Sequence, residues 1–460
     1  MRSAPKPLPT VGLEPPLNSV RTSRKGCQRG QTVERWRLAY DAAEIGGEAQ
    51  RVSEYQATLA RLYQLATRGG QLGLERMQAA CAAFGNPERS FAAVHVAGTN
   101  GKGTVCALTA TMLKASGKKV GLYTSPHLCR FSERIVIDGE PITDAELTPI
   151  LNEVLEKAQD LTFFEAATLA AFIAFQRAKV DIAVLEVGLG GRLDATNVIP
   201  APEVACITRI AFDHMAELGD SLAKIGAEKA GIIKAGSHVV LGKIHPDARE
   251  VIERRIADVG ATQIELGEPE PYPGAQLAYP RVAMFGTNLA VAATIARHFK
   301  IPPELMAQGI EDTSWPGRNE LLHRGGQELT LLDCAHNPDG AAMLSHVLES
   351  ILAEAIGNRR NVALVFGTKQ GKNWKAMLER LSNCVGHRVF VPPPISNAAP
   401  AQEMAKLFPG EIASDIATAL ARARELVGSR GLVVVTGSIF LVGAARAALL
   451  AIECDPAIDL

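Results

Sequence analysis

An apolar run that enters a glycine-rich turn constrains this chain more than any other stretch. Residues 94–97 read VHVA, residues 98–104 read GTNGKGT, and a segment compatible with a helix follows over 105–113. Three glycines within six positions let backbone N–H groups converge on an anion, while Lys102 adds a positive charge and Thr104 a hydroxyl. The pattern predicts a strand, a nucleotide-phosphate loop and a helix.

The loop departs from the usual Walker pattern, which puts Ser or Thr directly after the lysine and a glycine five positions before it. Gly103 and Ala97 stand at those places. GTNGKGT instead resembles the variant loop of ATP-dependent ligases that join an amino acid to a carboxylate. A glycine-rich loop without a ligand is the alternative, and the preceding strand pattern and the lysine argue against it.

Length and composition indicate an ordinary globular protein of two or three domains. The chain has 460 residues, 47% of them apolar, and a net charge of −1, so neither nucleic acid nor membrane is an expected partner. The eight cysteines are scattered without metal-ligand spacing, which favours reduced thiols and a cytoplasmic location. The apolar stretch 432–452 is interrupted by glycines and an arginine and predicts a strand, a turn and a helix rather than a membrane span.

The chain is predicted to have three parts. Residues 1–50 are rich in proline and basic residues and are expected to be disordered; a targeting peptide is the weaker alternative, because no sustained amphipathic pattern is present. Strand and helix patterns then alternate, and Trp315 to Arg318 read as a linker. This predicts domains at 51–317 and 318–460, although the proline-rich residues 236–280 resist assignment.

The alternation predicts the fold class. Apolar strands at 181–186, 204–210, 329–333, 361–366 and 432–435 are separated by helix patterns of crossover length. The expected α/β architecture is a phosphate-loop domain built on a mainly parallel sheet, followed by a smaller Rossmann-like α/β domain.

Eight motifs in order resemble the folylpolyglutamate synthase and dihydrofolate synthase family, a branch of the Mur-ligase-like amide-forming enzymes. The resemblance runs from about residue 55 to 450. The motifs are HVAGTNGKGT (95–104), YTSPHLCRFSERI (123–135), EVGLGGRLDATN (186–197), FDH (212–214), EKAGIIK (228–234), PGR (316–318), DCAHNPDGA (333–341) and VTGS (435–438).

Acidic and imidazole side chains stand where predicted strands end. Ligands of open α/β sheets gather at the carboxyl ends of the strands, which is where Glu186, Asp213 and His214 fall. The resemblance implies that Ser125 and Glu186 hold one Mg²⁺ and that His214 joins the metal site. Taken singly, Glu186 reads equally well as a cap, and His214 as a hydrogen-bonded neighbour of Asp213.

Lys229 shares a helical face with apolar residues, because Leu222, Ile225 and Lys229 follow at helical spacing. An amine in such a place loses part of its ammonium stabilisation. The resemblance implies that CO₂ carbamylates this lysine, which then binds a second Mg²⁺. Spacing alone favours a lysine that reaches from the helix edge to water.

The resemblance also implies contacts with substrates. ATP is expected at Thr99, Asn100, Gly101, Lys102, Gly103, Thr104, Asn288, Arg318, Asp333 and His336. The pterin or folate is expected at Thr162, Phe163, Phe164, Glu165, Leu193, Asp194 and Ala195.

Several of these residues have simpler interpretations. Phe163 and Phe164 suit core packing, Arg192 and Asp194 suit an ion pair, and Arg318 suits pairing with a nearby glutamate. Residues 284–285 are Met-Phe where the family usually has His-Gln, which puts base contacts from that segment in doubt.

The leading hypothesis is ATP-dependent ligation of L-glutamate to dihydropteroate or folate through an acyl phosphate, with Lys102, Glu186, His214 and Lys229 as catalytic residues. A Mur-type peptidoglycan ligase would carry a UDP-sugar-binding domain ahead of the loop, and residues 1–94 are too short for one. A non-catalytic nucleotide-binding protein would be expected to lack Lys102, Glu186 or His214. A monomer is the family expectation.

Overall fold

The computed structural model describes residues 45–67, 73–267, 281–323 and 329–456. The disordered extension predicted for residues 1–50 lies outside the described residues as far as residue 44. Helix α2 begins at Ile45, so residues 45–50 of the predicted disordered extension are helical, which corrects that end of the prediction. Among the described residues, no helix is both long and apolar enough to cross a membrane.

The first sheet has eight strands in the order β4-β3-β2-β5-β1-β6-β7-β8. All neighbours are parallel except β2 with β3 and β3 with β4, which are antiparallel. The strands are β1 (Ala92–Ala97), β2 (Val120–Tyr123), β3 (Ile135–Ile137), β4 (Glu140–Pro141), β5 (Ile182–Glu186), β6 (Val204–Ile207), β7 (His238–Leu241) and β8 (Thr262–Ile264).

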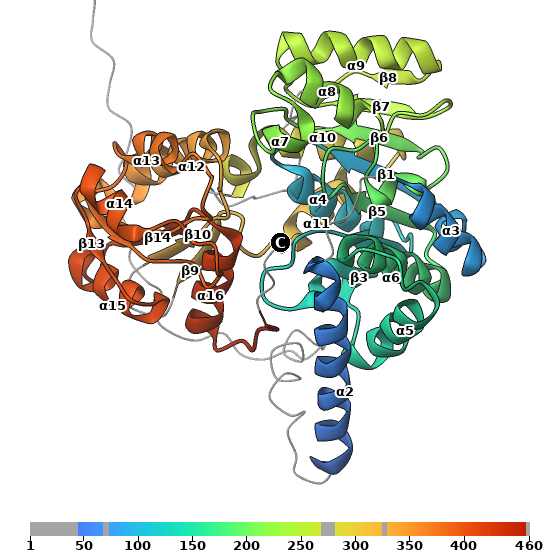
Figure 1. Ribbon diagram of the computed structural model, residues 1–460. Coiled ribbons are helices and arrows are strands. Elements are labelled where there is room, and N and C mark those ends of the chain that lie inside the picture. Colours follow the sequence, from blue (N-terminus) through green and yellow to red (C-terminus); the bar gives the residue numbers. More distant parts are fainter. Residues whose placement is uncertain (1–44, 68–72, 268–280, 324–328, 457–460) are drawn as a thin grey trace, which may run out of the picture. The chain divides into compact units, whose positions relative to one another are not determined.

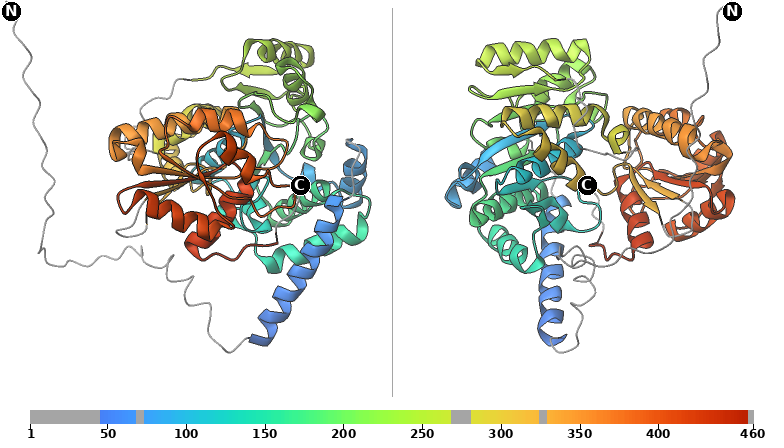
Figure 2. Two further views of the ribbon diagram at one scale, coloured as in Figure 1. Left: turned by 60° about the vertical axis from the view of Figure 1, so that its left-hand side comes forward. Right: turned by 180° about the vertical axis from the view of Figure 1, so that it is seen from behind.

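Helices cover both faces of this sheet, so its apolar central strands are buried on both sides. One face packs against α4, α10 and α11, and the other against α2, α3, α5 and α6 beside β1, β2 and β5, and against α8 and α9 beside β6 and β7 (Figure 2). The helices are α2 (Ile45–Gln64), α3 (Glu75–Ala83), α4 (Lys102–Ala115), α5 (Asp144–Lys157), α6 (Phe163–Ala178), α7 (Met215–Leu218), α8 (Leu222–Ala230), α9 (Pro246–Val259), α10 (Arg281–His298) and α11 (Pro303–Asp312).

The second sheet has six strands in the order β13-β12-β11-β14-β10-β9. It is parallel except for β9, which runs antiparallel to β10. The strands are β9 (Glu320–His323), β10 (Leu329–Leu332), β11 (Val362–Phe366), β12 (His387–Phe390), β13 (Glu411–Ile412) and β14 (Leu432–Thr436).

This sheet is also covered on both faces. Figure 1 shows α12 and α13 on one side of the strands and α15 and α16 on the other, in agreement with two separate apolar cores. The helices are α12 (Pro338–Ile351), α13 (Trp374–Leu381), α14 (Ala401–Leu407), α15 (Ile416–Val427) and α16 (Ile439–Leu450). The predicted fold class, a parallel phosphate-loop sheet followed by a smaller Rossmann-like sheet, is confirmed.

The last strand of the first sheet ends at Ile264, and the second sheet begins at Glu320. The predicted boundary near Arg318 falls between them, and its reading as a domain boundary stays a prediction. The unassigned stretch 236–280 contains β7, α9 and β8 over its described part. The described cysteines are free thiols, and Cys27 lies outside the described residues.

Candidate active site

The glycine-rich loop joins the carboxyl end of β1 to the first turn of α4. Gly101 adopts a φ of 88°, and a Cβ there would come within 2.3 Å of the side-chain oxygen of Asn288. Gly98 has no room either, because a Cβ would meet the Thr208 hydroxyl at 1.9 Å. Glycine at these positions therefore permits both the left-handed backbone and the close approach of neighbouring side chains. The free N–H groups at the start of α4 are left to face an anion.

A cavity of about 360 Å³ opens over this loop. Its lining combines loop residues with residues that follow β5 and β6 and with residues of the second sheet. The predicted ATP contacts and metal or catalytic residues all lie on its wall: Thr99, Asn100, Gly101, Lys102, Gly103, Thr104, Ser125, Glu186, His214, Lys229, Asn288, Arg318, Asp333 and His336. The structure thus brings together residues that are up to 237 positions apart in the sequence.

Glu186 ends β5 and is buried beside the phosphate loop. Its Oε2 accepts a hydrogen bond from the Ser125 backbone N–H at 3.0 Å. Burial raises the pKa of Glu186, and the neighbouring Lys102 ammonium and the Ser125 N–H oppose that rise. A buried carboxylate with a serine hydroxyl nearby and an anion loop within reach is a donor set that suits Mg²⁺, which completes its shell with phosphate oxygens and water. The residues therefore fit the divalent ion that the motifs imply.

Lys229 lies in α8 and does not reach water. Its side chain is buried, and its Nζ donates a hydrogen bond to the Gly98 carbonyl oxygen at 2.9 Å. Burial, with a further contribution from the Lys102 ammonium, lowers the pKa of Lys229 to about 7. The interpretation of this residue as a lysine reaching from the helix edge to solvent is wrong, because the apolar face of α8 carries it inward beneath the loop.

His214 and Asp213 are adjacent in the sequence but lie in different surroundings. The His214 ring is exposed at the cavity wall, whereas Asp213 accepts hydrogen bonds from Lys372 Nζ at 2.7 Å and from Asn337 Nδ2 at 3.0 Å. Burial alone would raise the pKa of Asp213, but His336 and Lys372 hold it far below its usual range. Asp213 is therefore a fixed anion that binds Lys372, Asn337 and His336, which lie beyond the carboxyl ends of β10 and β11.

Lys372 was missed by sequence reasoning. It lies in a glycine-containing loop that follows the carboxyl end of β11. A lysine in such a loop is a signal that could have been read, since ligands of parallel sheets collect at that end of the strands. Trp315 was also missed: its ring stands so close to Gly103 that a Cβ there would meet it at 2.6 Å.

Polar side chains join the loop to the start of α12. The Asn100 amide donates to Asn337 Oδ1 at 3.1 Å and to Asp339 Oδ2 at 2.8 Å. Arg209, which follows β6, donates to the same Asp339 carboxylate at 2.8 Å. The loop is thus held in place by residues of both sheets.

Arg318 and Asp333 face the cavity from the second sheet. The Asp333 carboxylate accepts from the backbone N–H groups of Asn319 and Ala335, both at 2.9 Å, and burial raises its pKa against the opposing Arg318 charge. Arg318 does not pair with Glu320, as its simpler interpretation required. Arg446 takes that carboxylate instead, at 3.0 Å.

The seven predicted pterin or folate contacts do not line this cavity. Thr162 and Glu165 form a capping box at the start of α6, and Glu165 also pairs with Arg76 at 2.9 Å. Phe163 is buried and packs edge-on against Tyr63, so its interpretation as core packing is confirmed. These residues build the helix that stands behind the cavity wall.

The remaining contacts lie in the same layer. Phe164 packs under Gly188, a wall residue, and Asp194 accepts from the backbone N–H of Leu189, another wall residue, at 2.8 Å. Leu193 is half-buried and Ala195 buried, next to Asp194. The suggested ion pair of Asp194 with Arg192 is wrong, because Arg192 pairs with Glu228.

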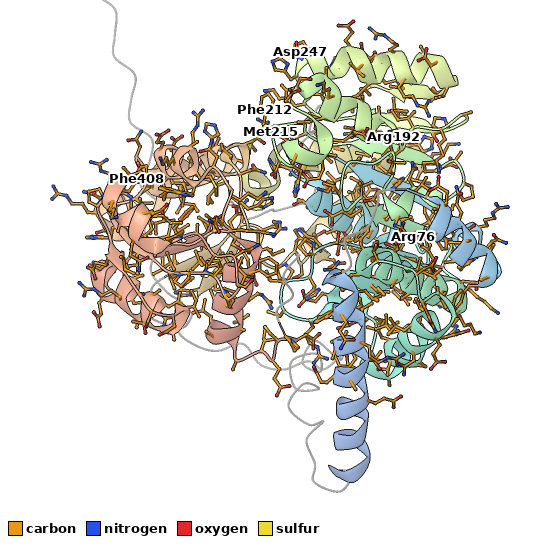
Figure 3. All side chains as sticks on the ribbon, in the orientation of Figure 1. Arg76, Arg192, Phe212, Met215, Asp247 and Phe408 are labelled. Atoms are coloured by element: carbon orange, nitrogen blue, oxygen red, sulfur yellow. The ribbon has the colours of Figure 1, made fainter. Side chains whose placement is uncertain are left out.

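Two apolar side chains flank His214 on the surface. Phe212 and Met215, labelled in Figure 3, are 51% and 53% exposed, an unusual position for large apolar groups. The side chains of Met284 and Phe285, whose departure from the family pattern raised doubt about base contacts, lie outside the described residues.

Comparison with known proteins defines the class first. Residues 96–267 match the family model of the Mur ligase middle domain, and residues 317–439 match that of the Mur ligase, glutamate ligase domain. Together with two α/β sheets and a phosphate loop on a shared cavity, these matches make the chain a Mur-type ligase.

Relatives then define the family. The chain is 34% identical to a folylpolyglutamate synthase from Lacticaseibacillus casei, over 80% of this chain and 92% of the relative. It is 31% identical to a dihydrofolate synthase/folylpolyglutamate synthase from Bacillus subtilis, over 82% of this chain and 95% of the relative. A crystal structure of the bifunctional enzyme from Yersinia pestis with AMPPNP and a Mn ion superposes with a TM-score of 0.76 at 33% identity, covering 86% of this chain and 98% of that one. The chain belongs to the folylpolyglutamate synthase and dihydrofolate synthase family.

Proposed function

We propose that this chain joins L-glutamate to the carboxylate of dihydropteroate and also extends reduced folates by further glutamates, with ATP as the co-substrate. The observation that carries the proposal is the single cavity over the phosphate loop, which holds Lys102, Glu186 and Lys229 on one side and Arg318 and Asp333 on the other. Relatives named for one activity and for both activities support the reaction class.

The chemistry starts from a carboxylate, which is a poor acyl donor. Attack of a carboxylate oxygen on the γ-phosphorus of ATP gives an acyl phosphate and ADP. The glutamate amine then attacks the acyl carbon, loses a proton, and phosphate leaves with the original carboxylate oxygen. Lys102 and the loop N–H groups offset the negative charge on the phosphoryl group during transfer.

Divalent metal, when bound, shields the phosphate oxygens from one another and from the incoming carboxylate. Two ions are proposed, one held by Ser125 and Glu186 and one by His214, Glu186 and a carbamylated Lys229. Glu186 is already fixed for this role by the Ser125 backbone N–H. His214 stands at the exposed side of the wall, and Asp213 is occupied by second-sheet partners.

Carbamylation of Lys229 requires an unprotonated amine that CO₂ can reach. The neutral amine attacks CO₂ and releases one proton, which converts an uncharged group into an anion next to the loop; starting from the ammonium form, a second proton is released. The carbamate nitrogen keeps one N–H, so the hydrogen bond to the Gly98 carbonyl oxygen can persist. Burial supports this assignment because it destabilises the ammonium form.

The seven pterin or folate residues are proposed to contact the pterin-bearing substrate from their positions behind the cavity wall. Asp194 holds Leu189 through its backbone N–H, and Phe164 supports Gly188 from behind. Direct contact would require these side chains to become part of the wall when substrate binds. We also propose that the protein acts as a monomer.

ADP release in the presence of Mg²⁺ and bicarbonate tests the proposal. The assay contains ATP, L-glutamate, and either dihydropteroate or tetrahydrofolate as acceptor. Turnover with both acceptors is expected, and turnover with only one would remove the corresponding half of the proposal. If ADP forms with neither acceptor, the whole proposal is overturned.

A matched pair of lysine variants guards against a contaminating ATPase. Lys102→Met is expected to reduce kcat by at least about a hundredfold, since it removes a charge from the transferring phosphoryl group. Lys119→Met alters an exposed lysine that directly precedes β2, at the opposite edge of the sheet from the loop, and is expected to keep wild-type activity. Equal rates in the two variants would show that the observed turnover does not come from this site.

A further inference from the structure

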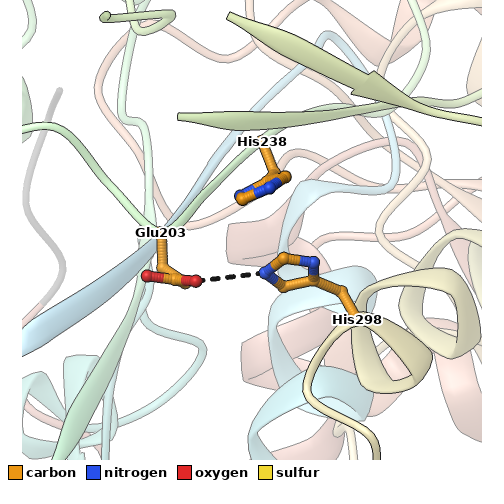
Figure 4. A group of neighbouring side chains, drawn as sticks. All are labelled: Glu203, His238 and His298. Carbon is orange, nitrogen blue, oxygen red and sulfur yellow. Dashed lines mark hydrogen bonds and ion pairs between the residues drawn. The ribbon is translucent and has the colours of Figure 1, made fainter. Parts of the chain in front are cut away.

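A carboxylate and two imidazoles gather at the amino-terminal edge of the first sheet (Figure 4). Glu203 directly precedes β6, His238 is the first residue of β7, and His298 is the last residue of α10. One donor atom from each residue lies within 4.8 Å of one donor atom from each of the others. The active-site residues described above do not include any of the three.

The backbone fixes two of these residues. The Glu203 N–H donates to the Ala93 carbonyl oxygen at 2.8 Å, and the His238 N–H donates to the Glu203 carbonyl oxygen at 3.1 Å. Neighbouring parallel strands therefore hold the two side chains side by side. His298 comes from a helix packed on the same sheet, so the three donors converge from three elements.

The three side chains lie close to one another. His298 Nε2 lies 3.1 Å from Glu203 Oε1, and the two imidazole rings are 4.3 Å apart with a 47° tilt between their planes. His238 Nδ1 is buried and has no hydrogen-bond partner among the described residues. With the ring proton on Nε2, this nitrogen keeps a lone pair that a metal ion can accept.

We propose that Glu203, His238 and His298 bind one transition-metal ion of the Zn²⁺ type. Two imidazole nitrogens with one carboxylate oxygen form a ligand set that suits Zn²⁺, Co²⁺ or Ni²⁺, whereas Mg²⁺ prefers oxygen donors alone. Three protein ligands leave a fourth position for water. The Glu203 carboxylate offsets one of the two positive charges of the ion, and both imidazoles bind it in their neutral form.

This site is separate from the phosphate loop. Glu203 stands at the amino end of β6, four residues before Ile207, and the loop follows the carboxyl ends of the same parallel strands. At the usual strand rise this is a separation of about 13 Å along the sheet. The connection between the two places is α10, which carries Asn288 against Gly101 near its kink and ends at His298. The ion therefore fixes the far end of a helix that contacts the loop.

Binding is tested with Co²⁺, whose ligand-field absorption reports the donor atoms, followed by displacement with Zn²⁺. The full-length protein is stripped with EDTA and kept in excess Mg²⁺ and ADP, which occupy the active-site cavity. The expected result is one equivalent of Co²⁺ with nitrogen and oxygen donors and without the strong charge-transfer band of a thiolate. Zn²⁺ should displace it.

Matched variants locate the ion. His238→Gln and His298→Gln should each weaken Co²⁺ binding by at least about tenfold, and Glu203→Gln, at an exposed position, should do so without affecting folding. His323→Gln removes an exposed histidine elsewhere and His214→Gln one in the cavity, and both should bind as the wild type does. Thermal midpoints of all variants are compared in EDTA to confirm folding.

Two results would overturn the proposal, and a third would support it. Absence of Co²⁺ binding in the wild type would mean that the cluster is an imidazole–carboxylate ion pair beside a second ring. Wild-type affinity in Glu203→Gln and His298→Gln together, with unchanged midpoints in EDTA, would place any bound ion elsewhere. A raised thermal midpoint with Zn²⁺ in the wild type but not in His298→Gln would support it independently of activity.

Discussion

Replacement of Lys229 by methionine gives a direct measure of how deeply this amine is embedded. The lysine is 4% exposed, and burial with the Lys102 charge lowers its pKa to about 7 from an ordinary 10.5. Because the folded-state pKa lies below that of the unfolded chain, the unfolded chain binds more protons between pH 7 and 10.5. Stability of the wild type should therefore rise with pH across this window.

The magnitude follows from the two pKa values. Protonation costs the folded state about 5 kcal/mol below pH 7, and the part recovered between pH 7.5 and 9.0 is about 2 kcal/mol. Lys229→Met removes this cost but leaves the Gly98 carbonyl oxygen without its donor, which offsets about 1–3 kcal/mol. At pH 7 the folded lysine is half titrated and the cost is about 4 kcal/mol, so the variant should be about 1–3 kcal/mol more stable than the wild type there, and the advantage should shrink as pH rises.

Urea unfolding followed by circular dichroism at pH 7.5, 8.2 and 9.0 measures the difference. Bicarbonate and Mg²⁺ are left out, so that the amine stays uncarbamylated, and other titrating groups cancel between the two proteins. A wild-type stability that rises by about 2 kcal/mol relative to the variant supports a buried, largely neutral lysine. Parallel pH curves for the two proteins would refute the reasoning, because they would mean that the ammonium is fully solvated in the folded state.

Three further changes test other parts of the structure. Gly103→Ala puts a Cβ 2.6 Å from the Trp315 ring and should weaken AMPPNP binding at least about tenfold by calorimetry, whereas wild-type affinity would contradict the crowding. Lys372→Met removes a partner of Asp213, so the pKa of the Asp213 carboxyl in the folded state should rise toward its ordinary value. The loss of stability on acidification should then begin at a higher pH, and an unchanged acid limb of the stability curve would argue against this pairing. Asp455→Ala removes a buried acceptor of a tyrosine hydroxyl and a backbone N–H, both at 2.7 Å, and should cost about 2–4 kcal/mol in urea unfolding, a cost that a merely tethered tail would not show.

The parallel architecture was predictable because its strands are continuous apolar runs. Buried on both faces, β5 and β14 lack the alternation of a half-exposed strand, and glycine-rich or acidic turns follow their carboxyl ends. The convergence of the cavity-lining residues was predictable for the same reason, since the ends of parallel strands share one edge. The folding of the loop against α12 was not, because it depends on pairs such as Asn100 and Asp339 that no local pattern links.

Three alternatives that local spacing offers fail for physical reasons. Spacing alone favours a Lys229 that reaches water, because spacing shows which face a residue occupies but not what covers that face. The alternative ion pairs, Arg318 with Glu320 and Arg192 with Asp194, do not form, because Arg446 pairs with Glu320 and backbone N–H groups bind Asp194. Ion pairs predicted between sequence neighbours do not form when the fold brings residues from distant segments closer to the same charged group.

The central claim is that the cavity over the phosphate loop activates a carboxylate as an acyl phosphate. Labelling the acceptor carboxylate with ¹⁸O and analysing the products of one complete turnover tests it most directly. One labelled oxygen should leave in inorganic phosphate and the other remain in the new amide, because the oxygen that attacks the γ-phosphorus departs with it. Label found in AMP, or absent from phosphate while amide forms, would contradict the account.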